Sequence, residues 1–438
     1  MAGPPQGGCT EDARLAACPG AAYGRRMDSW THGESALRLN AEMREAQAHT
    51  DTLFALISDE MLYERPVPDR HRLIFYVGHL DAFDWNQLGR GVIDLPPVHA
   101  AFDRLFEAGI DPPPGQAPED SPFDWPKLAE VRTYVTRTRR LLDERWEQLP
   151  GDRVLTALEH RWMHAETLCY LLHQLEPSKK RPPSRRPNGA AGANRSALNS
   201  DPWVGVLAGP AKLGQVAGAF GWDNEFPQHA VDVAAFEIAR RKVSNGQYLR
   251  FVDAGGAPPH FWQQRAGRWW LRRMFDEVPL PLEAPVYLTH RQATAYAEWV
   301  GARLPTEAQW QRAAYGDGER TFPWGSAPPD AERANLGFIG WDTLPVSAQP
   351  LSATPCGVEQ MLGNGWEWTS SAFSGFDGFE PRGYYPGYSA NFFDGAHYVL
   401  KGASPRTARR LARPSFRNWF RTEYPYAFAT ARLARGLG

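Results

Sequence analysis

Apolar side chains recur at roughly helical spacing from about residue 29 to residue 175. The first run, which predicts an amphipathic helix, consists of Leu37, Leu39, Met43, Ala46, Leu53, Leu56 and Ile57. Similar patterns predict helices near residues 79–88, over residues 126–149 and over residues 152–175, with Pro126 near the start of the third helix. Four such helices indicate a helical bundle over residues 29–178.

The pattern changes around residue 200. Residues 179–200 mix basic residues with Pro, Gly, Ala and Ser and lack large apolar side chains that could anchor them, which predicts an interdomain linker. Residues 201–438 are rich in Gly, Trp and Tyr, which predicts a second domain with little regular structure. One helix is expected over residues 291–299, and another after Thr306, which has the capping-box spacing with Gln309. The predicted fold class is α+β, with more than one domain.

The composition supports a folded protein and argues against several partners. The chain has 438 residues, about three times the usual domain length, and contains 17 Trp. The chain has 48 basic and 50 acidic residues, so it carries no excess of positive charge that would attract nucleic acid or anionic lipid. No apolar run approaches the roughly 20 residues of a membrane span. With four scattered cysteines and no signal-peptide pattern, we expect a soluble cytoplasmic protein whose residues 1–28 are a disordered extension.

Two histidines in the last helix of the predicted bundle are candidate metal ligands. His160 and His164 are four residues apart, so they differ by only about 40° around the helix axis and share a face. Such a pair suits one metal ion, although surface or core histidines produce the same spacing. Glu166 lies about 200° from His164 and points away from that face, so it is a poor ligand candidate.

A third ligand would have to come from another helix. His79 lies among apolar residues at the predicted start of the second helix, where a buried imidazole needs a partner. His71 and His99 lie in polar or Pro-rich surroundings, and His173 is about half a turn around the helix from His164. His79 is therefore the best third ligand, with a hydrogen-bonded core histidine as the alternative. Three neutral imidazoles would leave coordination positions open for small molecules.

Two segments of the second domain are dense in aromatic and polar residues, residues 363–369 and 413–420. Aromatic faces attract cations, including quaternary ammonium groups. The alternative is that both segments only pack a core that is rich in loops.

These segments also carry a resemblance to a known family. Residues 303–310 (RLPTEAQW), 322–325 (FPWG), 363–368 (GNGWEW) and 431–434 (ARLA) resemble signatures of formylglycine-generating-enzyme-like domains. The spacing of His160, His164 and Glu166, with His79 upstream, is similar to the iron-binding motif of DinB-like helical bundles. Fused in this order, the two halves resemble the ergothioneine-type sulfoxide synthases and their relative, selenoneine synthase.

The resemblance implies a mononuclear non-haem iron(II) enzyme. Such an enzyme uses O2 to form a carbon–sulfur or carbon–selenium bond on the imidazole ring of hercynine, the trimethylated betaine of histidine, and yields a sulfoxide or selenoxide. By resemblance, the iron ligands are His79, His160 and His164. Asn418 and Trp419 match the segment that receives hercynine, and Trp419 with Phe420 would face the trimethylammonium group.

The chain departs from the family pattern at Phe420, and its sequence does not identify the proton-donating tyrosine. Enzymes that use γ-glutamylcysteine have an Asp where this chain has Phe420, so cysteine or a selenosugar is the expected chalcogen donor. The family's proton-donating Tyr corresponds to Tyr384, Tyr385 or Tyr388, between which the sequence does not choose. Arg104 is a candidate for holding a donor carboxylate, with an ordinary surface arginine as the alternative.

Two other functions compete with this interpretation. A formylglycine generator would need a copper-binding cysteine pair near the C-terminus, but no cysteine follows Cys356. A metal-containing binding module without catalytic activity is the other alternative.

Overall fold

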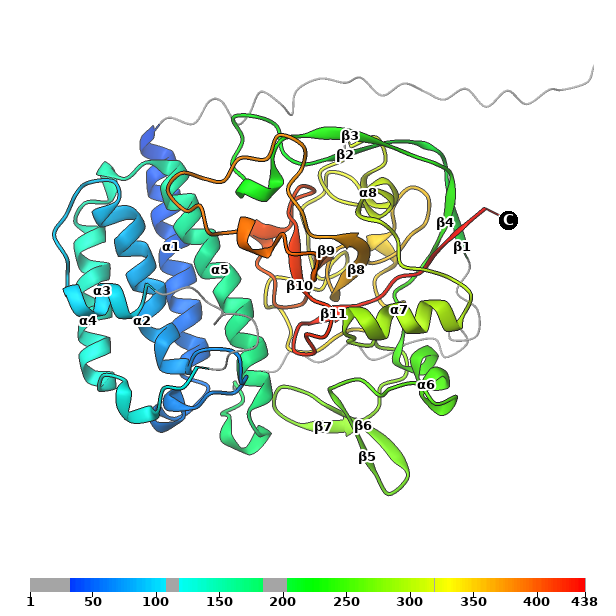
Figure 1. Ribbon diagram of the computed structural model, residues 1–438, viewed down its shortest axis with the longest axis horizontal. Helices are drawn as coiled ribbons and strands as arrows, with labels where there is room; N and C mark the ends of the chain where they lie inside the picture. Colours follow the sequence, from blue (N-terminus) through cyan, green and yellow to red (C-terminus); the bar gives the residue numbers. More distant parts are fainter. Residues whose placement is uncertain (1–31, 108–117, 184–202, 319, 438) are drawn as a thin grey trace, which may run out of the picture.

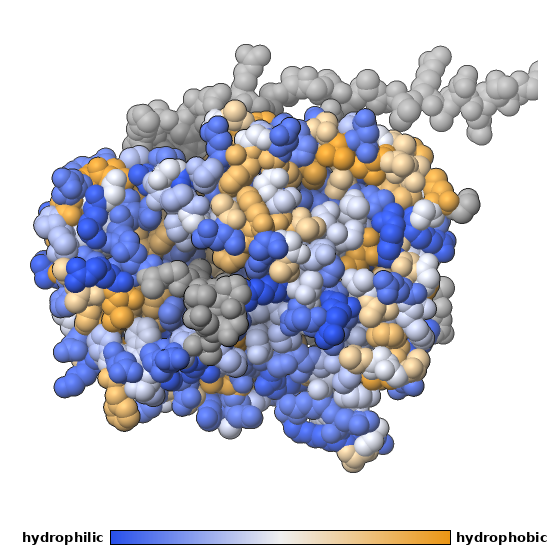
Figure 2. Space-filling model, viewed as in Figure 1, coloured by the Kyte–Doolittle hydropathy of each residue, from blue (hydrophilic) through white to orange (hydrophobic). Residues whose placement is uncertain are grey.

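The computed structural model describes residues 32–107, 118–183, 203–318 and 320–437. Figure 1 shows a helical domain beside a larger domain built from short strands, irregular loops and a few helices. The expected extension over residues 1–28 and most of the expected linker lie outside the described residues. No helix in the described ranges is long and apolar enough to cross a membrane. On the face drawn in Figure 2, apolar side chains form separate patches among polar ones.

Four long helices form the N-terminal domain, as predicted. They are α1 (His32–Phe54), α2 (Leu73–Asp84), α4 (Leu128–Asp143) and α5 (Gly151–Gln174). Helix α1 packs against α5, and α2 packs against α4. The shorter elements are the 3-10 helices η1 (Asp59–Tyr63), η3 (Pro122–Asp124), η4 (Trp146–Gln148) and η5 (Pro177–Lys179), the π-helix η2 (Trp85–Arg90) and the helix α3 (Ala100–Leu105).

The second helix differs most from the prediction. Helix α2 begins at Leu73, six residues before the predicted start, so His79 lies in its middle rather than at its first turn. All of its residues except Val77 are buried, and a helix buried on every side has no polar face to produce a periodic pattern. The third helix ends at Asp143 rather than near residue 149, because the chain continues as the separate element η4.

The segment that begins the expected linker is packed on the bundle. Lys180 is buried, and its Nζ donates hydrogen bonds to the carbonyl oxygens of Leu172 and Leu175 at 3.0 and 2.8 Å. The backbone N–H of Arg181 donates to the carbonyl of Leu56. Residues 179–181 therefore belong structurally to the helical domain.

The C-terminal domain has four small sheets around few helices. Its four-stranded sheet has the order β10-β9-β8-β11, a second sheet has the order β1-β4-β12, and the strands β2-β3 and β5-β6-β7 form two smaller sheets. The strands are β1 (Trp203–Val206), β2 (Gly209–Leu213), β3 (His229–Val233), β4 (Phe236–Ala239), β5 (Trp262–Arg265), β6 (Arg268–Arg272), β7 (Glu277–Pro279), β8 (Gly365–Ala372), β9 (His397–Ala403), β10 (Asn418–Arg421), β11 (Ala429–Thr430) and β12 (Ala434–Gly436).

The helices of this domain begin at side-chain caps. They are α6 (Asn245–Asp253), α7 (His290–Trp299) and α8 (Glu307–Tyr315). Thr306 caps α8 by accepting a hydrogen bond from the backbone N–H of Gln309, as its spacing predicted. A 3-10 helix, η7 (Asp223–Glu225), contributes Glu225 to the interface described below.

A buried ion cluster fixes the central strand of this domain. Glu367 on β8 accepts hydrogen bonds from Lys242 at 2.6 Å, from Arg432 at 2.7 and 2.9 Å and from the indole of Trp310 at 2.7 Å. Burial opposes ionisation of Glu367, but the charges of Arg432 and Lys242 outweigh it and lower the pKa of the carboxyl group. Glu367, in the aromatic segment 363–369, therefore anchors the sheet, while Trp366 beside it bonds to Glu166 of the helical domain.

Helix α5 joins the two domains through two carboxylates, the buried Glu159 and the partly exposed Glu166. Glu159 accepts hydrogen bonds from Arg413 at 2.7 and 3.0 Å and from the indole of Trp222 at 2.9 Å. Arg413 also pairs with the buried Glu225, so one guanidinium neutralises a carboxylate from each domain. Two turns further along α5, Glu166 accepts hydrogen bonds from Ser404, Thr407 and Trp366 of the C-terminal domain.

Replacing Arg413 with Met should lower the free energy of unfolding by about 3–5 kcal/mol, because Glu159 and Glu225 would remain buried without their cation. Urea denaturation of the purified variants measures this. Arg132→Met is the matched control: Arg132 pairs with Asp59 at the surface, so its loss should cost less than about 1 kcal/mol. Equally small losses in both variants would contradict the role given to Arg413.

Candidate metal centre and active site

Three histidines from two helices of the N-terminal domain meet in one cluster. His79 comes from α2, and His160 and His164 come from successive turns of α5. One ring nitrogen of each lies within 4.8 Å of the corresponding nitrogens of the other two. All three side chains are at most 3% exposed. The structure thus brings together the three residues that the sequence suggested as metal ligands.

The hydrogen bonds of these rings leave nitrogen lone pairs available. Nδ1 of His79 is 2.6 Å from the backbone carbonyl of Phe106, so it carries the proton and leaves the lone pair on Nε2. That Nε2, both nitrogens of His160 and Nδ1 of His164 are buried without a hydrogen-bond partner in the described part of the chain. Buried polar atoms are rarely left unsatisfied. These orphaned atoms fit a metal ion bound at the centre of the cluster.

Electrostatics keep the three rings neutral. Burial lowers the pKa of His79 to about 4 and lowers those of His160 and His164 well below their usual value. The neighbouring His79 and the cations Arg70 and Arg161 further lower the pKa of His164. Neutral imidazoles are the form that binds metals, and a set of three without a carboxylate suits Fe, Zn, Cu or Ni with open positions.

The other histidines considered from the sequence serve different purposes. His99 caps α3 by accepting a hydrogen bond from the backbone N–H of Phe102, and His71 stacks on Phe75. His173 stacks on Phe261 and lies 3.0 Å from the carbonyl oxygen of Arg272. Glu166, expected to point away from the cluster, is bound to the C-terminal domain as described above.

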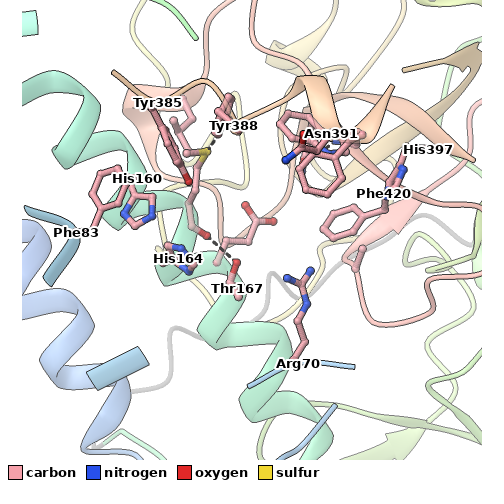
Figure 3. Close-up of a pocket in the computed structure, with 18 of the residues that line it drawn as sticks. Arg70, Phe83, His160, His164, Thr167, Tyr385, Tyr388, Asn391, His397 and Phe420 are labelled. Atoms are coloured by element: carbon pink, nitrogen blue, oxygen red, sulfur yellow. Dashed lines mark hydrogen bonds between the residues drawn. The ribbon is translucent and has the colours of Figure 1, made fainter. Parts of the chain in front are cut away.

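A cavity of about 710 Å³ lies beside the cluster and is lined by both domains. In Figure 3, His160 and His164 lie at one side, Phe420 and His397 lie at the other, and Arg70 reaches in from below. The cavity face of α5 includes His160, Met163, His164, Glu166, Thr167 and Tyr170. The site is therefore formed only where the two domains meet.

The three candidate tyrosines all line the cavity, but they differ in their bonding. The hydroxyl of Tyr384 lies 2.8 Å from Oγ1 of Thr156 and accepts a hydrogen bond from Arg382 at 2.7 Å. The hydroxyl of Tyr388 donates to Sδ of Met163 at 3.2 Å.

Tyr385 is the tyrosine directed at the histidine cluster. Its ring meets Phe83 edge-on at 5.3 Å, and Phe83 in turn stacks on His160 at 3.5 Å. Figure 3 shows its hydroxyl pointing toward the side of the cavity that holds His160 and His164. Burial raises the pKa of Tyr385 to about 12, so the hydroxyl keeps its proton at neutral pH.

The segment from Asn418 to Phe420 forms strand β10, and all three residues line the cavity. Oδ1 of Asn418 accepts a hydrogen bond from the backbone N–H of Trp419. The Trp419 ring stacks on Phe373 at 4.2 Å, whereas the Phe420 ring stacks on Tyr424 at 4.8 Å. Neighbouring residues of one strand thus belong to two different aromatic groups.

Arg104 is not brought to this site. It is exposed on α3 and does not line the cavity. Two arginines that the sequence analysis did not select line the cavity instead: Arg70, from the loop before α2, and Arg421, at the end of β10. Loop residues have no periodic pattern to mark them. Thr167, in contrast, was available from the sequence, because it follows His160 and His164 on the same face of α5 at helical spacing.

Comparison with known proteins agrees with this arrangement. The DinB superfamily model matches residues 42–174, and the sulfatase-modifying factor enzyme 1-like domain matches residues 190–437. A hercynine oxygenase from Mycolicibacterium thermoresistibile is 36% identical over 403 residues, covering 83% of this chain and 86% of that enzyme. The chain belongs to the hercynine oxygenase family.

Two further relatives support the assignment to the hercynine oxygenase family. The hercynine oxygenase of Mycolicibacterium smegmatis is 36% identical over 343 residues, covering 70% of this chain and 78% of that enzyme. Ergothioneine biosynthesis protein 1 of Neurospora crassa is 28% identical over 494 aligned positions, covering 87% of this chain and 56% of that protein. The resemblance found in the sequence, a DinB-like bundle followed by a formylglycine-generating-enzyme-like domain, is confirmed.

His160→Ala and His164→Ala should each reduce bound iron from about one ion per chain to well below half, because a three-ligand site loses much of its affinity with one ligand. Metal analysis after anaerobic reconstitution with iron(II) measures this, and circular dichroism checks the fold. Glu166→Gln is the matched control on the same helix and should keep most of its iron. Full iron content in a folded His164→Ala variant would refute the ligand set.

Proposed function

We propose that this protein is an oxidative synthase that joins a chalcogen donor to the imidazole ring of hercynine. With a thiol donor, one ring C–H and one S–H bond break, a C–S bond forms, and O2 supplies the sulfoxide oxygen and the oxygen of one water. A selenol donor would give the selenoxide in the same way. The observation that carries the proposal is the single cavity that contains three neutral histidines, Tyr385 and the Asn418–Trp419 segment.

The proposed cofactor is one iron(II), held by His79, His160 and His164. Iron bound there would supply the activation of O2 and an open position for a soft thiolate or selenolate. Other residues of the protein hold the three imidazole rings in position. Phe83 and Phe75 stack on His160 and His79 and hold the rings in place, and the carbonyl of Phe106 fixes the proton of His79.

Hercynine would be positioned by the C-terminal domain. The Asn418 side chain offers polar atoms to a betaine carboxylate, and Trp419 offers an aromatic face to the trimethylammonium group. Phe373 already stacks on one face of the Trp419 ring, so the cation would use the other face.

Tyr385 is the proposed proton donor among the three tyrosines. Its hydroxyl stays protonated at neutral pH and faces the metal cluster, whereas the hydroxyls of Tyr384 and Tyr388 are engaged with Thr156 and Met163. An acid positioned within hydrogen-bond reach of the reacting group can transfer its proton directly.

The chalcogen donor is proposed to be cysteine or a selenosugar rather than γ-glutamylcysteine. Phe420 gives an apolar wall, stacked on Tyr424, where an acidic residue would pair with the ammonium of a γ-glutamyl arm. A donor without that arm fits this wall better. Selenoneine synthesis is therefore a specific possibility within the proposed reaction.

The formylglycine-generating alternative has less support. A formylglycine-generating enzyme of Mycobacterium tuberculosis matches only 35% of this chain at 30% identity. The histidine cluster and part of the cavity wall come from the helical domain, outside residues 190–437, which match the sulfatase-modifying factor enzyme 1-like domain.

The proposed reaction is tested by product analysis. The full-length protein, reconstituted anaerobically with iron(II), is mixed with hercynine, one donor and O2, and the products are identified by mass spectrometry. We expect a hercynine sulfoxide or selenoxide adduct with cysteine or a selenosugar, and none with histidine in place of hercynine. If no donor yields an adduct from iron-loaded protein, the proposed function is wrong.

Tyr385→Phe should lower kcat by about 10²- to 10⁴-fold with little change in the KM for hercynine, because it removes a proton donor but no binding surface. Steady-state assays measure both constants. Tyr384→Phe is the matched control and should retain most of its activity, since its hydroxyl bonds to Thr156 and Arg382. A larger loss in Tyr384→Phe than in Tyr385→Phe would reverse the assignment.

A further inference from the structure

A network of buried charges crosses the helical domain next to the histidine cluster, and the proposed reaction does not use it. Arg161, the residue after His160 on α5, is fully buried. Its Nη2 donates hydrogen bonds to Asp81 at 3.1 Å and to Asp84 at 2.5 Å, both on α2. The side chains of the two aspartates are 1% exposed. One guanidinium therefore links the two helices that carry the proposed metal ligands.

The same network reaches the other two long helices. Arg139 on α4 donates hydrogen bonds to Asp81 at 2.9 and 3.1 Å and to Asp51 on α1 at 2.7 and 2.9 Å. Asp81 is thus shared between two arginines. Within this network, Arg161 connects α2 with α5, whereas Arg139 connects α2 with α4 and α1.

Helices α2 and α5 are not packed mainly on each other. Helix α1 packs against α5, and α2 packs against α4, so the histidine cluster joins two different helix pairs. Asp81 is two residues beyond His79, which is about 200° around α2. The ion pairs therefore hold the side of α2 away from His79. A contact there limits the rotation of α2 about its axis, and such a rotation would carry the imidazole of His79 out of the cluster.

Stability alone does not account for these ion pairs. Moving charges out of water is costly, and apolar side chains of similar volume often stabilise a core at least as well. The network is also incompletely bonded, because Nε and Nη1 of Arg161 and Oδ1 of Asp84 are buried without a hydrogen-bond partner in the described part of the chain. A buried ion pair does fix where its two groups lie, since separating them leaves an uncompensated charge. Fixing geometry is the role that this network fits.

A ring contact carries this geometry to the cluster. Phe83, which directly precedes Asp84 on α2, stacks on His160 of α5 at 3.5 Å. The same ring meets Tyr385, the proposed proton donor, edge-on at 5.3 Å. A shift of α2 relative to α5 would therefore displace His79, unstack Phe83 from His160 and change the contact with Tyr385.

We propose that Arg161 is a positioning residue that fixes α2 against α5 at the separation at which the three histidines bind one metal ion. It acts through Asp81 and Asp84 and does not line the cavity. The proposal rests on the proposed metal centre and adds the residue on which the geometry of that centre depends.

The test measures metal binding and stability in the same full-length variants. Iron(II) affinity is measured by anaerobic competition with a chromogenic chelator, the absorption spectrum of bound cobalt(II) reports the geometry of the site, and urea denaturation reports stability. We expect Arg161→Met to bind iron(II) about 10- to 100-fold more weakly than the wild type, the usual range for residues that orient metal ligands. Its cobalt(II) spectrum should differ from that of the wild type.

Arg139→Met is the matched control, because it also removes a guanidinium from Asp81. It should unfold at lower urea concentration than the wild type, as Arg161→Met should. Its iron(II) affinity and cobalt(II) spectrum should nevertheless remain those of the wild type, since the link between α2 and α5 is kept. Arg161→Lys should have intermediate affinity, because an ammonium keeps the charge on a shorter side chain without the planar fork.

A double variant separates position from charge. Arg161→Met with Asp84→Asn removes one positive and one negative charge, and Arg139 still neutralises Asp81. This variant should be more stable than Arg161→Met, because it leaves no carboxylate buried without a cation. Its iron(II) binding should stay weak and its cobalt(II) spectrum altered, since the link from α5 is still missing. It also carries the test if Arg161→Met does not fold.

Three results would overturn the proposal: wild-type affinity and spectrum in Arg161→Met, equal losses of affinity in Arg139→Met, or recovered affinity in the double variant. Tighter iron(II) binding in Arg161→Met would also overturn it, because Arg161 would then act by repelling the metal ion. A wild-type protein that binds no iron(II) would overturn the proposed metal centre, and this proposal with it. Iron(II) binding without any product from hercynine would count against the proposed reaction only.

Discussion

Helix α5 carries two carboxylates immediately beside His160 and His164, the proposed metal ligands, and both carboxylates have their partners in the other domain. Glu159 precedes His160, and Glu166 follows His164 by two residues. Burial raises the pKa of both carboxyl groups, which would be costly to bury without hydrogen bonds and a cation. Arg413 meets Glu159, and Ser404, Thr407 and Trp366 meet Glu166. The pairing fixes how the second domain docks.

That docking determines the shape of the cavity. With Glu159 and Glu166 hydrogen-bonded to the C-terminal domain, the face of α5 that carries His160 and His164 lies opposite strand β10 and the tyrosine-rich segment before β9. The same helix then presents His164, Thr167 and Tyr170 as a continuous wall, with Tyr385 at one end and Arg70 at the other. The cavity of this chain thus depends on a polar interface that each domain alone would leave unsatisfied.

The elements that the sequence predicted well were those with a local physical signal. Helix geometry puts His160 and His164, four residues apart, on one face of α5. The capping-box spacing of Thr306 and Gln309 likewise marks the start of α8. In each case the relevant atoms lie within two turns of one another. The helix angle did not show that Glu166 lines the same cavity as the histidines while it bonds to the C-terminal domain.

The elements that were missed depend on contacts distant in sequence. The start of α2 gave no periodic pattern because the helix is buried on nearly every side. Tyr385 can be distinguished from Tyr384 and Tyr388 only by the partners of their hydroxyls, which come from α5 and Arg382. Arg70 could not be preferred over Arg104, since its place in the cavity depends on Tyr170 and Tyr424.

The central claim is that metal and substrate meet in one cavity between the two domains. A crystal structure of the iron(II) protein with hercynine, prepared without O2, tests this most directly. The account predicts one iron bound by His79, His160 and His164, with the hercynine ring beside it and its trimethylammonium group near Trp419. Iron bound by other residues, or hercynine bound outside the interdomain cavity, would contradict the account.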